Sequence, residues 1–423
     1  MLTNEQKRAA RHLWENREKE VLHLVAGAGS GKTSTLIASL ECARDSDFDL
    51  SLVALITFTR KSAFEMKERA AHKNIKPGYI GTMHALGYSI IKKYFGQQKI
   101  KLIHNTRPVV SKIIADNFPD YKFIRSDIRG DASILKDEDK AIFAQLYHQY
   151  KKENSIFDMD DLITVAAKII TRNIKINPYR YILIDEFQDT SPEQLSLIKA
   201  MDPQKLFAVG DDWQSIYKFR GADVTITLEM DTHFRQLQRL FLTSNFRSQK
   251  KIVTLGNKAI KLSSSFIPKK LKTTVKGSLS PVCYVANCDG DIEAIWKAYV
   301  ENVLSKKKKK LTILVRTNHI RLQLQNYTNN EIEILTIHSA KGLEFDHLLI
   351  FGIARNIFPH KWNDYDEEVR LFYVAITRAK KSLDFICWEK ENKYSAFMPF
   401  LAKNCKVKYL NLKAPGHAAS PNL

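Results

Sequence analysis

The sequence predicts an α/β protein with parallel sheets, and three observations support this fold class. Short apolar runs that are typical of buried strands alternate with helical patterns along most of the chain. A glycine-rich loop stands between the first such strand and the helix after it. A later apolar strand ends in two consecutive carboxylates. Strand, loop and helix repeated in this order are the signature of a parallel sheet with helices on its faces.

The N-terminal part contains two strand–helix pairs after a short opening helix. Thr3-x-x-Gln6 predicts a helix that begins with a capping box. The apolar run 21–25 predicts a strand that ends in glycines, and a helical pattern follows it. Residues 52–56 predict a second buried strand, and a helix follows from Ser62.

Between residues 94 and 176 the pattern is mostly helical, so we expect an insertion there. Strand patterns return at 181–184, 206–209, 239–242, 311–315, 334–337, 347–350 and 382–387. Two similar α/β blocks are therefore expected, and the first of them carries the helical insertion. The segment after residue 413 is expected to fray.

The chain is strongly basic, with 66 Lys and Arg against 46 Asp and Glu and a formal net charge of +20. A surplus of this size predicts a polyanionic partner, above all nucleic acid. Residues 249–288 contain eight lysines and no acid, and residues 306–310 are all lysine. We expect the lysines of 249–276 to attract phosphates, although a solvated helix face is the alternative for about half of them.

The composition excludes several other classes of protein. Hydrophobic residues make up 44% and charged residues 26%, which is typical of a globular chain. No stretch approaches the roughly 18 apolar residues of a membrane span, and the charged N-terminus lacks the apolar core of a signal peptide. Five scattered cysteines suit reduced thiols. We therefore expect a cytoplasmic protein with no membrane partner.

The glycine-rich loop is Ala26-Gly-Ala-Gly-Ser-Gly-Lys-Thr33, between a strand and a helix. Glycines let backbone N–H groups turn inward around phosphate oxygens, and the helix N-terminus adds positive potential. In a phosphate loop Lys32 reaches the β- and γ-phosphates and the Thr33 hydroxyl holds Mg²⁺. The alternative is an ordinary glycine-rich turn, which Gly-Lys-Thr in register disfavours.

The second chemical signal is Asp185-Glu186 at the end of the apolar strand 181–184. Ligands of open α/β sheets bind at the carboxyl ends of the strands. We expect Asp185 to hold Mg²⁺ through water, and Glu186 to orient and deprotonate an attacking water. Alone the pair could be a solvated loop, but the phosphate loop strengthens the interpretation.

Together with these two motifs, a further set of segments resembles superfamily 1A DNA helicases of the UvrD/Rep/PcrA family. These segments stand in the family's order at 57–63, 81–84, 210–221, 242–248, 336–345 and 368–378. The resemblance covers most of the chain. It implies two RecA-like P-loop domains with a small helical insertion in the first, ATP and Mg²⁺ as cofactors, and single-stranded or tailed duplex DNA as partner.

The resemblance also assigns roles around the nucleotide. Gln214 would sense the γ-phosphate, and Arg247 and Arg378 would be two arginine fingers, each worth on the order of 10³–10⁵ in rate. If both reach the γ-phosphate, the nucleotide must sit in a cleft between two sheet domains. Gln6 would read adenine, with its capping-box role as the competing interpretation. The catalytic candidates are Lys32, Asp185, Glu186, Gln214, Arg247 and Arg378. The nucleotide-binding candidates are Gln6, Ala28, Gly29, Ser30, Gly31, Lys32, Thr33, Ser34, Phe246 and Glu344.

A second set of residues is assigned to DNA by the same resemblance. The candidates are Phe58, Arg60, Thr82, His84, Tyr217, Phe219, Arg220, Thr336, His338 and Lys341. Base stacking on an aromatic contributes about 1–3 kcal/mol and tolerates any sequence, so Phe58 and Phe219 are the favoured platforms. Trp213 is a further candidate platform, whereas Tyr217 could equally be a core residue. The acidic run 158–162 is either functional or a helix N-cap.

The chain departs from the family pattern at several positions. Ser34 stands where arginine often packs on adenine, Phe246 where tyrosine is usual, and Phe219 where tryptophan is common. Between Ser248 and Thr336 the strand–helix pattern of the second domain fills the space of the family's large 2B subdomain. The chain thus resembles short forms without 2B, similar to UvrD-like subunits of phage-defence systems such as Gabija.

The expected domain organisation has five segments. They are 1–95 (domain 1A, first part), 96–177 (helical insertion 1B), 178–236 (domain 1A, second part), 237–390 (domain 2A without 2B) and 391–423 (C-terminal segment).

Three functions compete at this point. The first is an ATP-dependent single-stranded DNA translocase and 3′→5′ helicase, a polarity that only the resemblance implies. The second is a DNA-stimulated ATPase that senses DNA ends beside a nuclease partner and unwinds little by itself. The third, a passive basic DNA-binding protein, conflicts with the catalytic set. The pathway, from DNA repair to antiviral defence, and the oligomeric state remain open.

Overall fold

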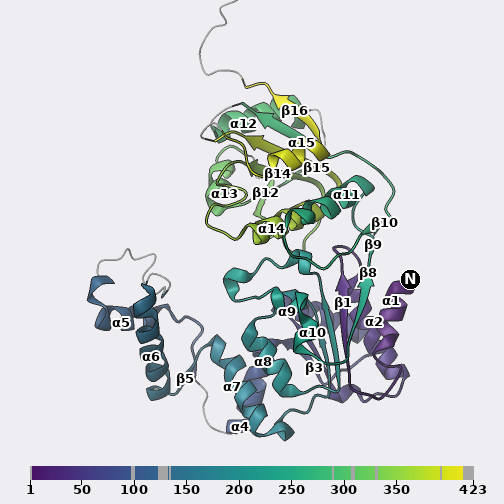
Figure 1. Ribbon diagram of the computed structural model, residues 1–423, viewed down its shortest axis with the longest axis vertical. Helices are drawn as coiled ribbons and strands as arrows, with labels where there is room; N and C mark the ends of the chain where they lie inside the picture. Colours follow the sequence, from purple (N-terminus) through teal and green to yellow (C-terminus); the bar gives the residue numbers. More distant parts are fainter. Residues whose placement is uncertain are drawn as a thin grey trace, which may run out of the picture. The chain divides into compact units, whose positions relative to one another are not determined.

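The computed structural model describes residues 2–96, 101–121, 132, 135–287, 290–305, 310–328, 332–390 and 393–412 (Figure 1). Most of the lysine run at 306–310 and the tail after residue 412 lie outside these ranges. The chain forms two compact units. One comprises Met1–Ser46, Ile184–Thr190 and Phe207–Leu423, and the other comprises Asp47–Leu183 and Ser191–Leu206.

The first sheet has six parallel strands in the order β3-β2-β6-β7-β1-β8. Their bounds are β1 Glu20–Ala26, β2 Val53–Thr57, β3 Tyr79–Thr82, β6 Tyr181–Ile184, β7 Lys205–Gly210 and β8 Leu237–Leu242. Every residue of β1, β2, β6 and β7 is buried. Such strands are mostly apolar because both faces of a parallel sheet are covered.

Helices of the same part of the chain connect these strands. They are α1 Asn4–His12, α2 Lys32–Asp45, α3 Arg60–His72, α4 Met83–Phe95, α7 Met159–Arg172, α8 Pro192–Met201, α9 Thr225–Leu228 and α10 Met230–His233. Helices α4 and α7 touch closely at a glycine, since a Cβ on Gly87 would lie 2.2 Å from the carbonyl oxygen of Leu162.

The stretch expected as a helical insertion contains α5 (Arg107–Asn117) and α6 (Asp137–Glu153). A two-stranded parallel sheet of β4 (Lys101–Leu102) and β5 (Ile156–Phe157) stands at its ends. The two helices enclose a small apolar core of their own, made of Val110, Ile113, Ile114, Phe118, Leu135 and Phe143. The boundaries of the five expected segments remain predictions.

The second sheet also has six parallel strands, in the order β13-β12-β14-β15-β11-β16. Their bounds are β11 Val282–Ala286, β12 Thr312–Val315, β13 Glu333–Thr336, β14 Phe345–Ile353, β15 Ala379–Trp388 and β16 Lys406–Leu410. A short parallel pair, β9 (Ser244–Asn245) with β10 (Lys272–Thr273), stands apart from both sheets. The predicted α/β class with two parallel sheets is confirmed.

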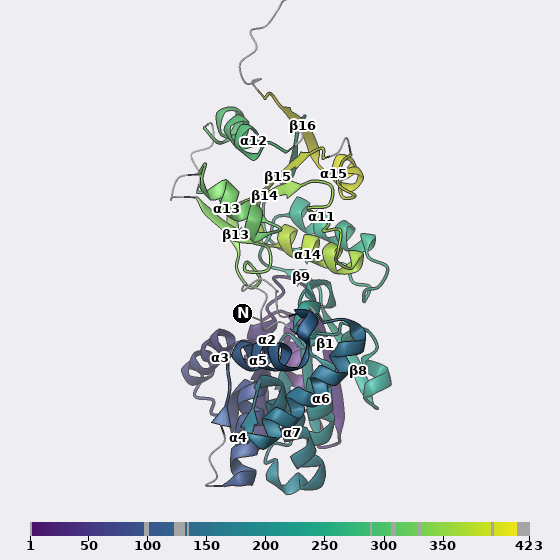
Figure 2. The ribbon, with the colours of Figure 1, turned by 90° about the vertical axis from the view of Figure 1, so that its left-hand side faces the viewer.

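Helices cover the second sheet on both faces (Figure 2). One face packs against α11 (Lys250–Ala259), α14 (Tyr365–Thr377) and α15 (Met398–Asn404), and the other packs against α12 (Ile292–Tyr299) and α13 (Asn318–Gln325). Along β15, Phe385 and Cys387 belong to the first face, and Ile386 and Trp388 to the second. This alternation is the two-residue period of a strand that is buried on both sides.

The two sheets share one topology. Read in order, β13, β12, β14, β15, β11 and β16 occupy the places of β3, β2, β6, β7, β1 and β8. The loop between α13 and β13 comprises only residues 326–332, and full-sized relatives of the family that the sequence resembles carry 2B at this place. No helix in the described ranges is long and apolar enough to span a membrane.

Candidate active site

The glycine-rich loop joins β1 to α2, as predicted. Gly29 and Gly31 have φ angles of +67° and +83°, in the left-handed region that glycine adopts without strain. A Cβ on Gly31 would lie 2.3 Å from Nε2 of Gln6, and one on Gly29 would lie 2.7 Å from Cβ of Arg247. The loop is therefore held closely by two other predicted members of the site.

Gln6 combines the two interpretations that the sequence left open. Its Oε1 accepts a hydrogen bond of 2.8 Å from the backbone N–H of Thr3, which completes the predicted capping box. Its Nε2 donates to the carbonyl oxygen of Ser30 at 2.9 Å. The capping box is confirmed, and the same amide fixes the phosphate loop. Its role toward adenine stays a prediction. The amide carries two N–H groups, and the hydrogen bond to Ser30 uses one of them.

Strand β6 delivers Asp185 and Glu186 beside this loop. The Lys32 ammonium lies 3.5 Å from Oε2 of Glu186. Burial and the Glu186 carboxylate raise the pKa of Asp185 to about 7. Burial alone would raise the pKa of Glu186 as well, but Lys32 and Lys341 outweigh it and lower that pKa to about 2. Glu186 is thus an ionised acceptor, and its backbone is left-handed with φ +52°.

The same charges act on Lys32. Burial works against its ammonium, but the carboxylates of Glu186, Asp211 and Asp185 hold the pKa of Lys32 above its ordinary value. A lysine that stays charged at the helix N-terminus is what an anionic phosphate chain requires.

Thr33 and Asp185 offer the donor set that Mg²⁺ prefers, a hydroxyl and a carboxylate oxygen. The raised pKa of Asp185 means that local cations do not balance its negative charge, so a divalent cation would stabilise the ionised form. The described residues contain no cluster of three or more His, Cys, Asp or Glu side chains with metal-binding geometry.

Gln188 connects two loops of the site, and the sequence analysis assigned it no role. Its side chain is fully buried, and its Nε2 donates to Oε2 of Glu186 at 2.6 Å. Its Oε1 accepts from the backbone N–H of Asp211 at 2.8 Å. Gln188 thereby ties the loop after β6 to the loop after β7. Its only sequence signal is its place two residues after Glu186.

The loop after β7 carries Gln214, whose side chain contacts that of Arg378. Nη2 of Arg378 donates to Oε1 of Gln214 at 2.7 Å, and Nε2 of Gln214 donates to Oδ2 of Asp211 at 2.6 Å. Burial and the neighbouring Arg247 lower the pKa of Arg378 to about 9. A buried guanidinium held in this way gains stability from an added anion.

Arg247 and Glu344, both predicted at the nucleotide, contact each other. Nε of Arg247 donates to Oε2 of Glu344 at 2.8 Å, and Nη1 donates to the carbonyl oxygen of Thr377 at 3.3 Å. Asn245, which the sequence analysis missed, orients this segment. Its Nδ2 donates to the carbonyl oxygen of Ala28 at 2.7 Å, while its Oδ1 accepts from the backbone N–H of Arg247 at 3.0 Å.

Two predicted nucleotide contacts lie at the rim. The backbone N–H of Phe246 donates to the carbonyl oxygen of Gly29 at 2.9 Å, and its ring is 42% exposed. Ser34 is exposed in the first turn of α2. The ring is therefore accessible for stacking on a base.

Several DNA candidates form one aromatic cluster, made of Tyr217, Phe219 and His338. Phe219 is 64% exposed, and its ring meets that of His338 edge-on at 5.3 Å between centroids. The Arg220 guanidinium lies 5.0 Å from the centroid of Tyr217 and 5.5 Å from that of Phe219. Burial and Arg316 lower the pKa of His338 to about 4. An exposed ring beside a cation suits a stacked base on a charged backbone.

Lys341 faces inward from this cluster. Its ammonium lies 4.4 Å from the ring centroid of Tyr217 and contacts Oδ2 of Asp189 at 2.5 Å. It also donates to the carbonyl oxygen of Gln214 at 3.0 Å. In this conformation the charge of Lys341 is occupied by protein groups, and its predicted contact with DNA remains a prediction. Thr336 closes a local turn through its 2.7 Å contact with Ser339.

The remaining DNA candidates lie in the other compact unit. Thr57 of β2 pairs with Thr82 of β3, so Phe58 and His84 follow neighbouring strand ends. Arg60 opens α3 and is exposed, and Thr82 caps α4 through the backbone N–H of Ala85. Aromatic and cationic candidates for DNA contact therefore lie together at one edge of the first sheet.

Three residues correct or settle the sequence interpretation. Trp213 is 1% exposed and its Nε1 donates to the carbonyl oxygen of Ile267 at 3.1 Å, so its assignment as a base-stacking platform is wrong. The side chain of Lys269 is fully buried beside Asp211, so its assignment to phosphate attraction is also wrong. Asp158 caps α7 in a capping box, which confirms the N-cap interpretation of the acidic run.

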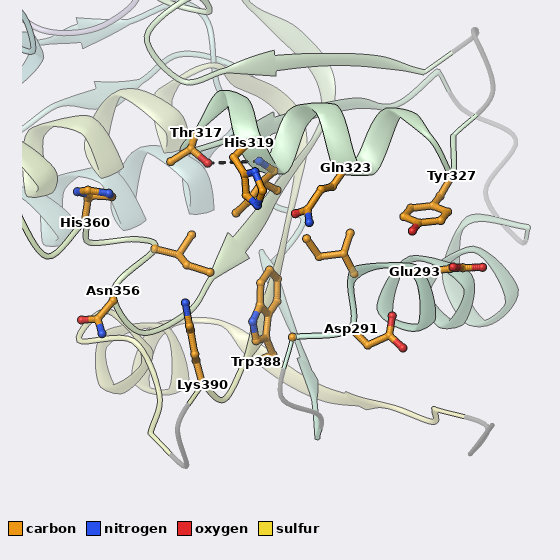
Figure 3. Close-up of a pocket in the computed structure, with 14 residues that line it drawn as sticks. Asp291, Glu293, Thr317, His319, Gln323, Tyr327, Asn356, His360, Trp388 and Lys390 are labelled. Carbon is orange, nitrogen blue, oxygen red and sulfur yellow. Dashed lines mark hydrogen bonds between the residues drawn. The ribbon is translucent and has the colours of Figure 1, made fainter. Parts of the chain in front are cut away.

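The second sheet carries a cavity of about 620 Å³ beyond the ends of β11, β12, β14 and β15 (Figure 3). By topology this is the place of the nucleotide loop in the first sheet. Asp291 caps the N-terminus of α12 where Gly31 stands before α2, and Glu293 lies in the first turn of α12. Carboxylates at this position repel a triphosphate, so the nucleotide loop of the first sheet is the favoured site.

Comparison with known proteins agrees with this geometry. Residues 2–235 match the UvrD/REP helicase N-terminal domain, and residues 321–391 match the UvrD-like helicase C-terminal domain. DNA helicase IV of Escherichia coli is 26% identical over 93% of this chain and 69% of its own length. The ATP-dependent DNA helicases PcrA of Staphylococcus epidermidis and Rep of Salmonella typhimurium are each 30% identical over 70% of this chain, which spans 46% and 50% of their lengths. The chain therefore belongs to the UvrD/Rep/PcrA family of superfamily 1A ATP-dependent DNA helicases.

Proposed function

We propose that this chain is an ATP-driven single-stranded DNA translocase with 3′→5′ helicase activity. One observation carries the proposal. A continuous series of contacts leads from the phosphate loop to the arginine that precedes β15 of the second sheet. Its members are Lys32, Glu186, Gln188, Asp211, Gln214 and Arg378. Each member of the series has a polar partner that fixes its orientation, and preorganised groups of this kind stabilise developing charge.

The residues divide the chemistry of hydrolysis among them. Lys32 would neutralise the β- and γ-phosphates, and Arg247 and Arg378 would stabilise charge on the transferred phosphoryl group. Glu186 would accept a proton from the attacking water. Lys32 is the cation that lowers the pKa of Glu186 most, so movement of Lys32 toward phosphate would make Glu186 a stronger base. Mg²⁺ held by Thr33 and Asp185 would neutralise charge on the phosphoryl oxygens.

The contacts also suggest how ATP acts on DNA. Arg378 immediately precedes β15 of the second sheet and Arg247 follows β9, whereas Lys32, Glu186 and Gln214 follow strands of the first sheet. A γ-phosphate would tie both sets together, and hydrolysis would release them. Lys341 joins the carbonyl oxygen of Gln214 to the cluster of Tyr217, Phe219 and His338. The grip on a stacked base would therefore follow the state of the nucleotide.

A second function is favoured by the short loop between α13 and β13. Without a 2B subdomain the chain could act as a DNA-stimulated ATPase that senses DNA ends beside a nuclease partner. Phage defence is one context in which such a subunit would serve.

Strand release from labelled duplexes separates the two functions. The purified chain would be mixed with ATP, Mg²⁺ and duplexes that carry a 3′ tail, a 5′ tail or none. The first function predicts release from 3′-tailed duplexes only, and Glu186→Gln as a control should release nothing. Strong ATP turnover on tailed DNA without any release would favour the second function and contradict the first.

A further inference from the structure

Lys269 is a buried cation that the reaction as described above does not use. Its side chain is fully buried, and its ammonium lies 3.0 Å from Oδ1 of Asp211 and 2.6 Å from Oδ1 of Asp212. It also lies 4.1 Å from the ring centroid of Trp213. A lysine loses its hydration here, so the two carboxylates must compensate for it.

The segment around Lys269 is bound to the loop after β7 at two further points. Oδ2 of Asp212 accepts from the backbone N–H of Ile267 at 2.7 Å. Nε1 of Trp213 donates to the carbonyl oxygen of Ile267 at 3.1 Å. Three consecutive residues, Asp211 to Trp213, are thus fixed by the segment 267–269, which precedes β10. The residue after them is Gln214.

The orientation of the Gln214 amide depends on the charge state of Asp211. An ionised carboxylate only accepts hydrogen bonds, so the amide turns its Nε2 toward Oδ2 of Asp211. Its Oε1 is then free to accept from Arg378. A protonated Asp211 would donate instead, which favours the opposite amide orientation and places an N–H group against the Arg378 guanidinium.

We infer that Lys269 is a positioning residue for the ATPase reaction, because it keeps Asp211 an acceptor and thereby directs Gln214 toward Arg378. The inference rests on the proposed function and adds a residue to its machinery. Lys269 touches neither phosphate nor water in this account. It acts through two intermediates, Asp211 and Gln214, and Trp213 covers it from solvent.

The charge balance around Asp211 makes the inference testable. Adjacent carboxylates repel each other, and the Lys269 ammonium lies within 3.0 Å of an oxygen of each. Burial raises the pKa of Asp212, and Lys269 works against that shift. The charged, titratable and polar groups that act on Asp211 are Lys269, Asp212, Lys32 of α2, Tyr373 of α14, Arg378, Gln188 and Gln214.

The test compares Lys269→Met, Lys269→Arg and the double variant Lys269→Met/Asp212→Asn with the wild-type chain. The double variant removes one carboxylate together with the cation, so the formal charge of the cluster is unchanged. Lys403→Met, at an exposed position on α15, serves as the matched control. The readouts are kcat and KM for ATP with single-stranded DNA between pH 6 and 9, thermal unfolding, and a crystal structure of each folded variant.

Lys269→Met should lower kcat at pH 7 by about 10-fold, less than the 10²–10³ for loss of a directly acting donor. KM for ATP should stay within about twofold, since binding groups are untouched. The acid limb of the kcat profile should move to higher pH, because the Lys269 charge no longer opposes protonation of the carboxylate cluster. In Lys269→Arg and in the double variant, the acid limb of the kcat profile should lie close to its wild-type pH. Lys403→Met should change neither quantity.

Two results would overturn the inference. One is a folded Lys269→Met variant with an unchanged kcat profile. The other is a crystal structure of that variant in which the Arg378–Gln214 hydrogen bond keeps its 2.7 Å length. If Lys269→Met does not fold, the double variant decides. Its cluster has the formal charge of the wild-type cluster, so an acid limb displaced to higher pH in this variant would contradict the inference. Should the wild-type chain hydrolyse no ATP, the proposed function fails, and the crystal structures alone decide this inference.

Discussion

Nη2 of Arg378 donates a hydrogen bond of 2.7 Å to Oε1 of Gln214, although 164 positions separate the two residues in the sequence. Gln214 follows strand β7 of the first sheet, and Arg378 immediately precedes β15 of the second. The contact joins the γ-phosphate sensor and the arginine finger that the family resemblance assigns. The contact holds the Arg378 guanidinium in a defined orientation beside Gln214.

Arg378→Ala should abolish most ATP turnover. A positioned arginine finger contributes on the order of 10³–10⁵ in rate, so we expect kcat to fall by about 10³ or more. KM for ATP should change only a few-fold, because the phosphate loop is intact. Steady-state ATP hydrolysis with saturating single-stranded DNA measures both. A variant with kcat within about tenfold of wild type would exclude Arg378 as a finger.

Lys32→Ala and Glu186→Gln should each stop hydrolysis while leaving DNA binding largely intact. Lys32 is the cation of the phosphate loop, and Glu186 is the ionised acceptor beside it. ATP turnover and the anisotropy of a labelled single strand would be measured on the same preparations. Near wild-type turnover in either variant would show that the site is assigned to the wrong residues.

Asp185→Asn should raise thermal stability at pH 8 in the absence of Mg²⁺, and should also abolish hydrolysis. The pKa of Asp185 is raised from 3.8 to about 7 in the folded chain. The folded state therefore binds more protons than the unfolded state between these values, and stability falls as pH rises through this window. Asparagine removes that penalty.

Differential scanning calorimetry at pH 5 and pH 8 would check the Asp185 prediction. The gain from Asp185→Asn should be large at pH 8 and small at pH 5, where the wild-type carboxyl is already protonated. Adding Mg²⁺ should stabilise wild type at pH 8 more than the variant. An equal gain at both pH values would contradict the raised pKa.

Phe219→Ala should weaken binding of single-stranded DNA. The ring is 64% exposed and lies next to Arg220 and His338, and loss of one stacked base costs about 1–3 kcal/mol. This corresponds to a Kd that is about 5- to 150-fold higher. Phe219→Trp should bind at least as tightly as wild type, since it enlarges the stacking face. Unchanged Kd values for both variants would exclude the cluster as a base platform.

Local sequence patterns predicted the features of the site and fold that depend on interactions between residues close together in the sequence. The phosphate loop, the carboxylates after β6 and the capping box at Thr3 and Gln6 each depend on neighbours within a few residues. The parallel α/β class followed from short, mostly apolar strands that alternate with helical patterns. These features are visible in the sequence because their physical causes lie within one strand or one turn.

Long-range contacts could not be predicted in this way. Gln188, Asn245 and Lys269 act through partners in other segments, and nothing in their own surroundings distinguishes them from solvated polar residues. Trp213 illustrates the converse error. An aromatic residue in a motif loop can face solvent or the interior, and only the packing of Ile267 and Lys269 against it decides that it is buried.

The most direct test of the account is steady-state ATP hydrolysis by the wild-type chain with and without single-stranded DNA. The contacts that run from Lys32 through Gln214 to Arg378, and from Gln214 through Lys341 to the aromatic cluster, predict strong stimulation by DNA. Arg378→Ala should remove that stimulated rate. Equal rates with and without DNA would show that the nucleotide site and the aromatic cluster are not coupled, and would contradict the account.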